Sequence, residues 1–339
     1  MRTEYPDYYS KFHCLAEACP DTCCKEWEVD VDEDTFYYYK VQEGAIGEKL
    51  AQNLKEEGDC KYIPLREDGT CPFLTGEHLC ELCSALGEEG MSQTCQEYPR
   101  YYMGIGSYEQ IDLSLSCMET GRLLFLRTTP IRYIRAEDEE EAWETLSPED
   151  EKRLTEILQI RDDLIAALQK EECRGAICKA GDMQVPADTV GAKKMPEVPE
   201  IPDILPDGQE DACLLKLLPR MDVMNAEGGR IMAQLQEEYE VLREREAAFR
   251  ESYGSLLQQL FTKFAVYLVY RYTIDSFYEG SLDAEKRLWK RSLRLVLLMC
   301  IHYEWKEGAF GAGSMIQMTH LFSRQIEHSD ENVELMKSC

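Results

Sequence analysis

The stretch "FHCLAEACPDTCCKEWEVDVD", residues 12–32, places four cysteines within eleven positions, and two of them are adjacent. Ten of the chain's 15 cysteines lie at or before Cys117, so the thiols are concentrated in the first part of the sequence. Crowded cysteines form a disulfide framework in an oxidising compartment, and bind metal or carry out redox chemistry in a reducing one. The cellular compartment therefore determines whether these cysteines are expected to form disulfides or to bind metal or carry out redox chemistry.

Two features of the sequence predict a cytoplasmic protein. The start, "MRTEYPDYYS", lacks the basic region and the apolar run of a signal peptide. The longest strongly apolar run, "LVLLMCI" at residues 295–301, is too short to cross a bilayer. An odd number of cysteines also fits a complete disulfide framework poorly. We therefore expect metal binding or redox chemistry in the N-terminal segment.

The charge of the chain limits its partners. It has 37 basic and 65 acidic side chains and a net charge of −28. Nucleic-acid binding requires cationic surface, and so does docking on anionic lipid, so we expect neither a nucleic acid nor a membrane as partner. An acidic protein attracts a basic partner, or a lysine side chain that is offered as substrate.

The order of patterns along the chain predicts a mainly α fold in four parts. Turn formers such as Asp68-Gly69 and Thr75-Gly76 predict short hairpins in a loop-rich module, and apolar residues at steps of three and four predict helices further on, including about 284–306 and 314–337. The expected fold is a cysteine-rich metal-binding module packed on a C-terminal helical bundle. Its parts are a module at 1–125, a helical segment at 126–180, a proline-rich acidic linker at 181–212 and the bundle at 213–339.

The cysteine spacing favours a thiophilic centre without identifying it. Only Cys80 and Cys83 have the C-x-x-C spacing that is common in zinc knuckles. The spacing Cys14-x4-Cys19-x3-Cys23 matches neither a zinc ribbon nor the C-x3-C-x2-C triad of radical enzymes. Four thiolates suffice for zinc or for an iron–sulfur cluster, and some of these cysteines could instead be apolar core residues.

Several motifs together resemble known sequences. The first hundred residues resemble the CxxCxxCC type of putative zinc- or iron-chelating domain. The motifs that carry this resemblance are, in order, C-x4-C-x3-CC, "CPFL" at 71–74, "LC" at 79–80 and "TCQEYPR" at 94–100. With "YPDYYSKFHC" at the start, "SLSC" at 114–117 and "FSRQIEHS" at 322–329, the chain resembles the flagellin lysine-N-methylase family over nearly its whole length.

This resemblance implies an S-adenosylmethionine-dependent protein-lysine N-methyltransferase with flagellin as its protein substrate. It also implies a cysteine-bound iron–sulfur cluster, with zinc as the alternative. The metal ligands that it implies are Cys14, Cys19, Cys23, Cys24, Cys71, Cys80, Cys95 and Cys117.

The catalytic residues are less well defined by the sequence. Methyl transfer to an amine requires a neutral lysine, and a carboxylate, tyrosine or histidine could remove its proton; Arg100 could bind the carboxyl group of the donor. The candidates are Tyr98, Arg100, Glu327 and His328. The donor site is not identified, because "GIG" at 104–106 lacks the strand–loop–helix context of a nucleotide fingerprint.

Two other functions are compatible with these residues. The missing donor fingerprint favours a non-enzymatic, metal-stabilised scaffold that binds flagellin or another partner. A weaker alternative is a redox or metal-carrier protein that uses the adjacent pair Cys23 and Cys24.

Overall fold

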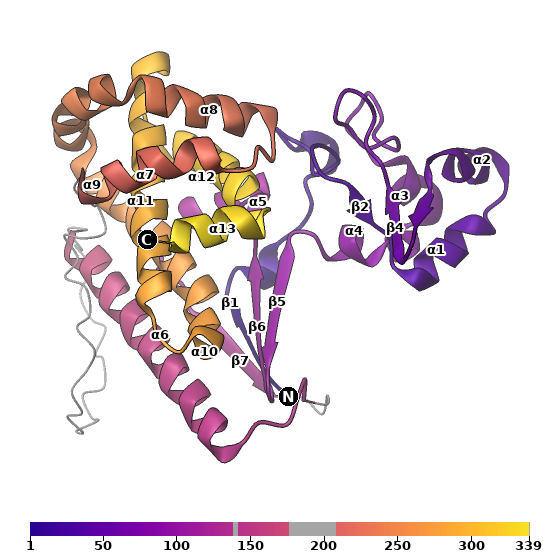
Figure 1. Ribbon diagram of the computed structural model, residues 1–339, viewed down its shortest axis with the longest axis horizontal. Coiled ribbons are helices and arrows are strands. Elements are labelled where there is room, and N and C mark those ends of the chain that lie inside the picture. The colour runs from indigo at the N-terminus through magenta and orange to yellow at the C-terminus, as the bar shows by residue number, and fades with distance from the viewer. Residues whose placement is uncertain (138–141, 176–207, 339) are drawn as a thin grey trace. The chain divides into compact units, whose positions relative to one another are not determined.

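The computed structural model describes residues 1–137, 142–175 and 208–338, and the side chains of 171–175 are not described (Figure 1). The chain forms two compact units. Unit 1 comprises Met1–Gly104, Glu109–Leu123 and Ile131–Glu139, and unit 2 comprises Ile105–Tyr108, Leu124–Pro130 and Glu140–Cys339. Helices predominate among the described residues, which confirms the predicted mainly α fold. Most of the predicted linker, residues 181–207, lies outside the described residues.

Unit 1 combines two small sheets with short helices. A four-stranded sheet has the order β5-β6-β1-β7, and a three-stranded sheet has the order β2-β4-β3. The strands are β1 (Arg2–Pro6), β2 (Val29–Asp30), β3 (Lys55–Glu57), β4 (Cys60–Ile63), β5 (Arg100–Ile105), β6 (Tyr108–Leu113) and β7 (Tyr133–Glu137). The helices are α1 (Glu33–Lys40), α2 (Gly44–Asn53), α3 (Glu81–Leu86), α4 (Gln93–Glu97) and α5 (Met118–Phe125).

Local signals explain how these elements begin and pair. The Asp32 carboxylate accepts a hydrogen bond from the Thr35 backbone N–H at 2.9 Å and so caps α1. Strands β3 and β4 form a hairpin in which Glu57 pairs with Cys60, and Gly58 supplies the left-handed backbone (φ +62°) of its two-residue loop. The turn predicted at Asp68-Gly69 is also present, since the Thr70 backbone N–H donates to the Asp68 carboxylate at 3.0 Å.

Unit 2 contains the remaining helices, among them the longest, α9 with 34 residues. They are α6 (Pro148–Gly175), α7 (Asp211–Leu217), α8 (Ala226–Glu237), α9 (Tyr239–Tyr272), α10 (Ser276–Glu279), α11 (Asp283–Glu307), α12 (Ala312–Phe322) and α13 (Asp330–Lys337). Helices α6 and α11 both pack on α9. From Leu260 to Tyr272 every residue of α9 is buried, as expected for a helix that is surrounded on all sides.

The helix predicted at 314–337 is divided into three pieces. After α12 the chain continues as a π-helix, Ser323–Glu327, and α13 then starts at a new N-cap, where the Ser329 hydroxyl accepts from the Asn332 backbone N–H at 3.1 Å. Apolar periodicity continues across this break, and therefore the sequence pattern alone predicted one helix. The helix predicted at 284–306 agrees with α11.

A buried ion network connects three helices of unit 2. The guanidinium of Arg294 in α11 is fully buried and binds the carboxylates of Asp211 in α7 and Glu246 in α9, each through two hydrogen bonds of 2.5–2.9 Å. The hydroxyl of Tyr239 also donates to Asp211 at 2.5 Å. Paired geometry of this kind compensates for the large cost of removing the charges from water.

A second buried carboxyl makes the stability of unit 2 dependent on pH. Glu285 in α11 is fully buried, and burial raises the pKa of its carboxyl from 4.5 to about 7. The charge of Glu279 adds to this shift, whereas the ammonium of Lys337, 4.0 Å from Glu285 Oε1, opposes it. The folded state therefore holds a proton that the unfolded state releases, and this contribution to stability falls as pH rises from about 4.5 to about 7.

We expect Glu285→Gln to abolish this decline, because the amide carries no charge at either pH. Between pH 4.5 and pH 7 the wild type should lose about 3 kcal/mol more of its free energy of unfolding than the variant loses. Urea unfolding at pH 5 and at pH 7.5 measures it, with Glu240→Gln at an exposed position (side chain 77% exposed) as the control. Equal pH slopes for the wild type and Glu285→Gln would refute the prediction.

Candidate metal centre

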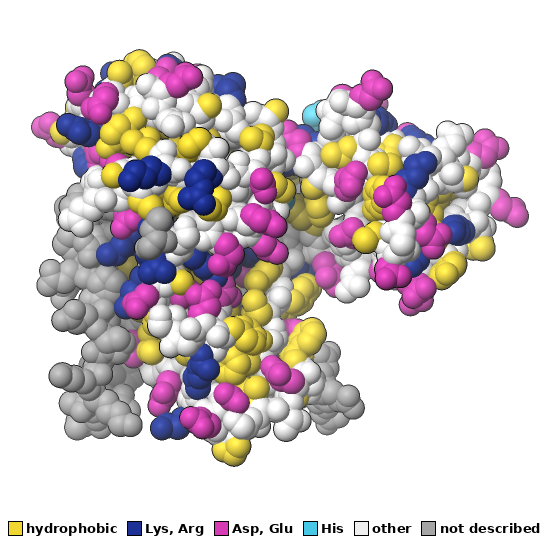
Figure 2. All heavy atoms as spheres, viewed as in Figure 1, with side chains coloured by type: hydrophobic (Ala, Val, Ile, Leu, Met, Phe, Trp, Pro, Cys, Tyr) yellow, Lys and Arg dark blue, Asp and Glu magenta, His cyan; other side chains and the backbone are white. Residues whose placement is uncertain are grey.

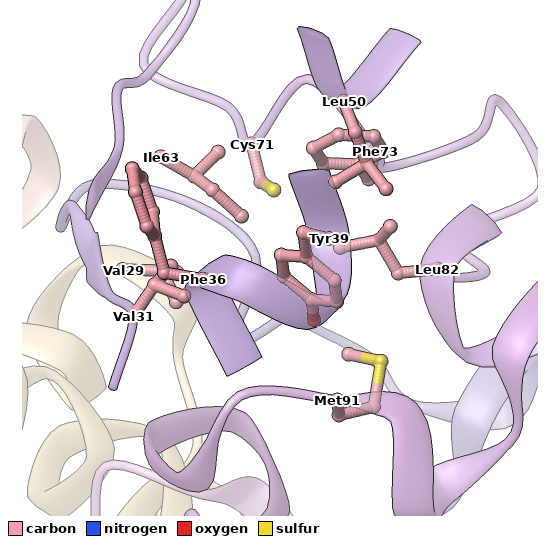
Figure 3. Close-up of a cluster of buried hydrophobic side chains, with 10 residues drawn as sticks. All are labelled: Val29, Val31, Phe36, Tyr39, Leu50, Ile63, Cys71, Phe73, Leu82 and Met91. Carbon is pink, nitrogen blue, oxygen red and sulfur yellow. The ribbon is translucent and has the colours of Figure 1, made fainter. Parts of the chain in front are cut away.

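The thiols of unit 1 gather around one hydrophobic core. This core consists of Val29, Val31, Phe36, Tyr39, Leu50, Ile63, Cys71, Phe73, Leu82 and Met91. Figure 3 shows Cys71 among aromatic and aliphatic side chains, with its sulfur directed into the cluster. Four further cysteines pack against it: Cys24, Cys80, Cys83 and Cys95. We call these five residues the core thiols.

Backbone pairing between loops brings the core thiols together. The Cys71 N–H donates to the Cys24 carbonyl at 2.8 Å. A β-bridge joins Leu74 to Cys80, and the Glu81 N–H donates to the Phe73 carbonyl at 2.8 Å. Helix α3 starts immediately after Cys80, so Cys83 lies one turn further along the same helix. The loops that carry Cys24, Cys71 and Cys80 are thus joined by single backbone hydrogen bonds and a one-residue bridge, and not by extended strand pairing.

The core thiols interact directly with one another. Cys24 hydrogen bonds with Cys23 and with Cys80, and the bond with Cys23 contributes most to raising the pKa of Cys24. The bond with Cys24 likewise raises the pKa of Cys80 well above its usual value, with burial as the second cause. Burial raises the pKa of Cys95 to about 11. At neutral pH these groups are thiols unless a cation stabilises their ionised form.

The remaining predicted ligands form a second group. Burial raises the pKa of Cys19, and the charge of Cys14 adds to this effect. Cys117 lies directly before α5, where its sulfur accepts hydrogen bonds from backbone N–H groups, yet burial raises its pKa to about 11. The charge of Cys19 also raises the pKa of Cys117. Of the predicted ligands, Cys24, Cys71, Cys80 and Cys95 belong to the core thiols, and Cys23 is bonded to Cys24. Cys14, Cys19 and Cys117 form the second group, although the charge of Cys14 also raises the pKa of Cys83.

The resemblance did not assign Cys83, which the structure places among the core thiols. Its C-x-x-C spacing from Cys80 was the signal that could have identified it. Cys60, which the resemblance also left unassigned, is exposed on β4 and does not belong to this core. None of the ten cysteines up to Cys117 forms a disulfide.

The donor chemistry of the core fits a thiophilic metal. Cys71 is buried and the other four core thiols are partly buried against the same apolar core, and zinc and iron–sulfur clusters prefer thiolate ligands. Among the described residues, no group of three or more His, Cys, Asp or Glu side chains has the arrangement of a complete metal site. The residues present thus supply the donors but not a finished coordination geometry.

Two of the predicted catalytic residues lie in unit 1. The hydroxyl of Tyr98 is 3.1 Å from the hydroxyl of Ser116, which directly precedes Cys117, and its ring centroid lies 5.8 Å from that of Trp27. The Arg100 guanidinium donates to the Gln96 carbonyl at 3.3 Å. It also lies 5.7 and 5.5 Å from the ring centroids of Tyr9 and Phe12. Tyr98 is thus held near the second cysteine group.

The other two candidates lie together in unit 2. The Glu327 carboxylate ends the π-helix and accepts hydrogen bonds from Ser323, from Tyr267 at 3.0–3.1 Å and from Tyr272 at 2.8 Å. The Arg271 guanidinium is 3.5 Å from the same carboxylate. Sequence reasoning missed these partners, although the aromatic run "YLVYRY" at 267–272 marks them.

His328 is uncharged at neutral pH. Burial, together with the positive charge of Arg324, lowers the pKa of its imidazole to about 4. A neutral imidazole can accept a proton, but one with so low a pKa is a weak base.

Comparisons with known proteins connect the chain to flagellar proteins and to lysine methylation. It is 30% identical over 126 residues to the flagellar biosynthetic protein FliU of Salmonella muenchen, an alignment that covers 35% of this chain and 75% of FliU. Lysine-N-methylases of Salmonella typhimurium and Salmonella choleraesuis are each 29% identical over 126 residues. The chain spans 31% of the length of each methylase. No family model and no solved structure matches the chain.

One structural property bears on the membrane. Among the helices that the structure describes, none combines the length and the apolar character needed to cross a bilayer.

Proposed function

Because this chain belongs to the flagellin lysine-N-methylase family, we propose that it transfers a methyl group from S-adenosylmethionine to lysine side chains of flagellin. The main support for this proposal is the alignment with FliU, because the aligned region covers 75% of that protein. The names of the relatives support a flagellar role and lysine methylation. The donor and the exact substrate are inferred from the resemblance in the motifs.

We further propose that Cys24, Cys71, Cys80 and Cys95 hold a metal centre. These four residues belong to the predicted ligand set and also surround one core. An iron–sulfur cluster is the centre implied by the motifs, and zinc is the alternative. When bound, the centre would supply positive charge that stabilises the thiolates and holds the connecting loops together. The roles of Cys14, Cys19, Cys23 and Cys117 as ligands remain predictions.

Methyl transfer to a lysine amine requires three functions of the protein. The protein must bind the sulfonium donor, orient the lysine amine in line with the methyl group, and keep the amine uncharged. Tyr98, Arg100, Glu327 and His328 remain the candidates for these tasks. The carboxylate of Glu327 accepts its hydrogen bonds from groups within unit 2, so its contribution would be to position the π-helix residues around it.

The net charge of −28 supports a lysine-bearing substrate. A strongly acidic surface accelerates encounter with cationic groups, and salt weakens this attraction.

Incubation of metal-replete protein with methyl-labelled S-adenosylmethionine and purified flagellin tests the proposed function. Label is expected on N-methyllysine after acid hydrolysis of flagellin, and flagellin whose lysines have been acetylated should remain unlabelled. Binding of flagellin without any label would contradict the enzyme proposal and favour the scaffold alternative.

A further inference from the structure

Helix α1 carries aromatic residues on two different sides. Phe36 and Tyr39 are buried in the core of unit 1, with 1% exposure each. The neighbouring large side chains point outward instead, since Tyr37 is 54%, Tyr38 42% and Val41 72% exposed. Tyr37 and Tyr38 lie four and three residues before Val41, the C-cap residue of α1, so both are neighbours of Val41 on the helix surface. This arrangement leaves an apolar, aromatic stripe on the surface of unit 1.

The buried side of the same helix shows which group such rings attract. The ammonium of Lys40 lies 4.2 Å from the Phe36 ring centroid, and that of Lys61 lies 5.6 Å from it. Both distances are within the range of cation–π attraction. Among the described residues, no lysine or arginine of the chain is positioned in this way over the rings of Tyr37 or Tyr38. The outer rings are therefore available to cations from another molecule.

Acidic side chains border the exposed stripe. Asp34 lies one turn before Tyr37 and Tyr38 on the same side of α1 and is exposed. The exposed acids Glu33, Glu43, Glu88 and Glu89 lie on α1 or on the segments next to it. Figure 2 shows hydrophobic, acidic and basic side chains intermixed on the surface around α1.

The ring of Tyr38 is also partly ordered before any partner binds. A Cβ atom added at Gly90 would lie 3.6 Å from the Tyr38 ring, so this ring rests on the turn that contains Glu88 and Glu89. A preordered ring loses little conformational entropy on binding.

We propose that Asp34, Tyr37, Tyr38 and Val41, here named the α1 face, bind a lysine-bearing surface of the protein substrate. The inference rests on the proposed function and adds a recognition site to it. Aromatic rings next to carboxylates bind ammonium groups by cation–π attraction and ion pairing, and Val41 contacts the aliphatic part of the lysine side chain. A second copy of this chain is disfavoured as the partner, because each copy carries a net charge of −28.

The test compares flagellin binding by three variants. The first is the triple substitution Tyr37→Ser, Tyr38→Ser and Val41→Ser, which removes the rings, and the second is Asp34→Lys, which reverses the charge. The control is Tyr278→Ser, which removes a tyrosine that is 64% exposed in unit 2. Titration calorimetry with purified flagellin gives Kd, and thermal unfolding shows whether each variant keeps its fold.

We expect the triple variant to weaken flagellin binding about 5- to 30-fold and to raise KM by a similar factor. Asp34→Lys should weaken binding in the same direction, whereas Tyr278→Ser should bind like the wild type. Acetylated flagellin should bind the wild type and the triple variant equally weakly.

Two results would overturn the inference. One is an unchanged Kd in both the triple variant and Asp34→Lys while the wild type binds and methylates flagellin, which would leave the proposed function intact. The other is a wild type that does not bind flagellin. Conversely, weaker binding by the variants together with no methylation by the wild type would support the α1 face and refute the enzyme.

Discussion

Cys80→Ser is expected to lower the affinity for the bound metal at least about 100-fold and to abolish detectable methyl transfer to flagellin. Cys80 has direct contacts with the other core thiols, because it hydrogen bonds with Cys24 and starts the helix that carries Cys83. A serine hydroxyl is a poor ligand for a thiophilic centre, so the remaining thiols would have to hold the metal with an incomplete set. The loops that meet at Cys24 and Cys71 would then lose the positive charge that joins them.

The matched control is Cys60→Ser, which removes an exposed thiol outside the core. It should retain full metal content and full activity. Metal analysis after dialysis against a chelator of known affinity measures the first effect, and the labelled methyl assay measures the second. Circular dichroism at the assay temperature shows whether Cys80→Ser remains folded. A folded Cys80→Ser protein with the metal affinity of the wild type would exclude Cys80 as a ligand.

Arg294→Met is expected to destabilise unit 2 by about 3–5 kcal/mol, because it leaves two carboxylates without their shared partner in a buried site. Arg294 is 0% and Asp211 3% exposed, so water cannot replace the lost hydrogen bonds easily. The three residues come from α11, α7 and α9, and therefore the loss affects the packing of three helices. Urea unfolding monitored by circular dichroism measures the change.

Two further substitutions show whether geometry or charge dominates this network. Arg294→Lys keeps the charge but loses the paired hydrogen bonds, and it should be intermediate in stability. Lys152→Met breaks an ion pair with Glu156 whose side chains are 76% and 63% exposed, and it should cost about 0.5 kcal/mol or less. A loss below about 1 kcal/mol for Arg294→Met would mean that the buried network contributes little net stability.

Much of the architecture was predictable from local patterns. The apolar run within residues 284–306 predicts α11 to within one residue at each end. Helix propensity and periodicity are local properties, and therefore one sequence is enough to detect them.

The grouping of the cysteines was not predictable in the same way. Cys24, Cys71 and Cys80 meet through single backbone hydrogen bonds and a bridge between loops, and no spacing rule encodes these contacts. The π-helix Ser323–Glu327 was missed because Ile326 keeps the four-residue apolar spacing from Phe322, while tyrosines from α9 bind the carboxylate at its end. Long-range partners of this kind leave no periodic signal in the sequence.

Whether the core thiols bind a metal is decided by iron, zinc and acid-labile sulfide analysis of the anaerobically purified wild-type protein, together with its absorption spectrum. We expect stoichiometric metal that disappears when Cys24 and Cys80 are both replaced by serine: a brown sample with equal iron and sulfide for a cluster, or a colourless one with zinc. A folded, active protein that contains neither iron nor zinc would contradict this expectation.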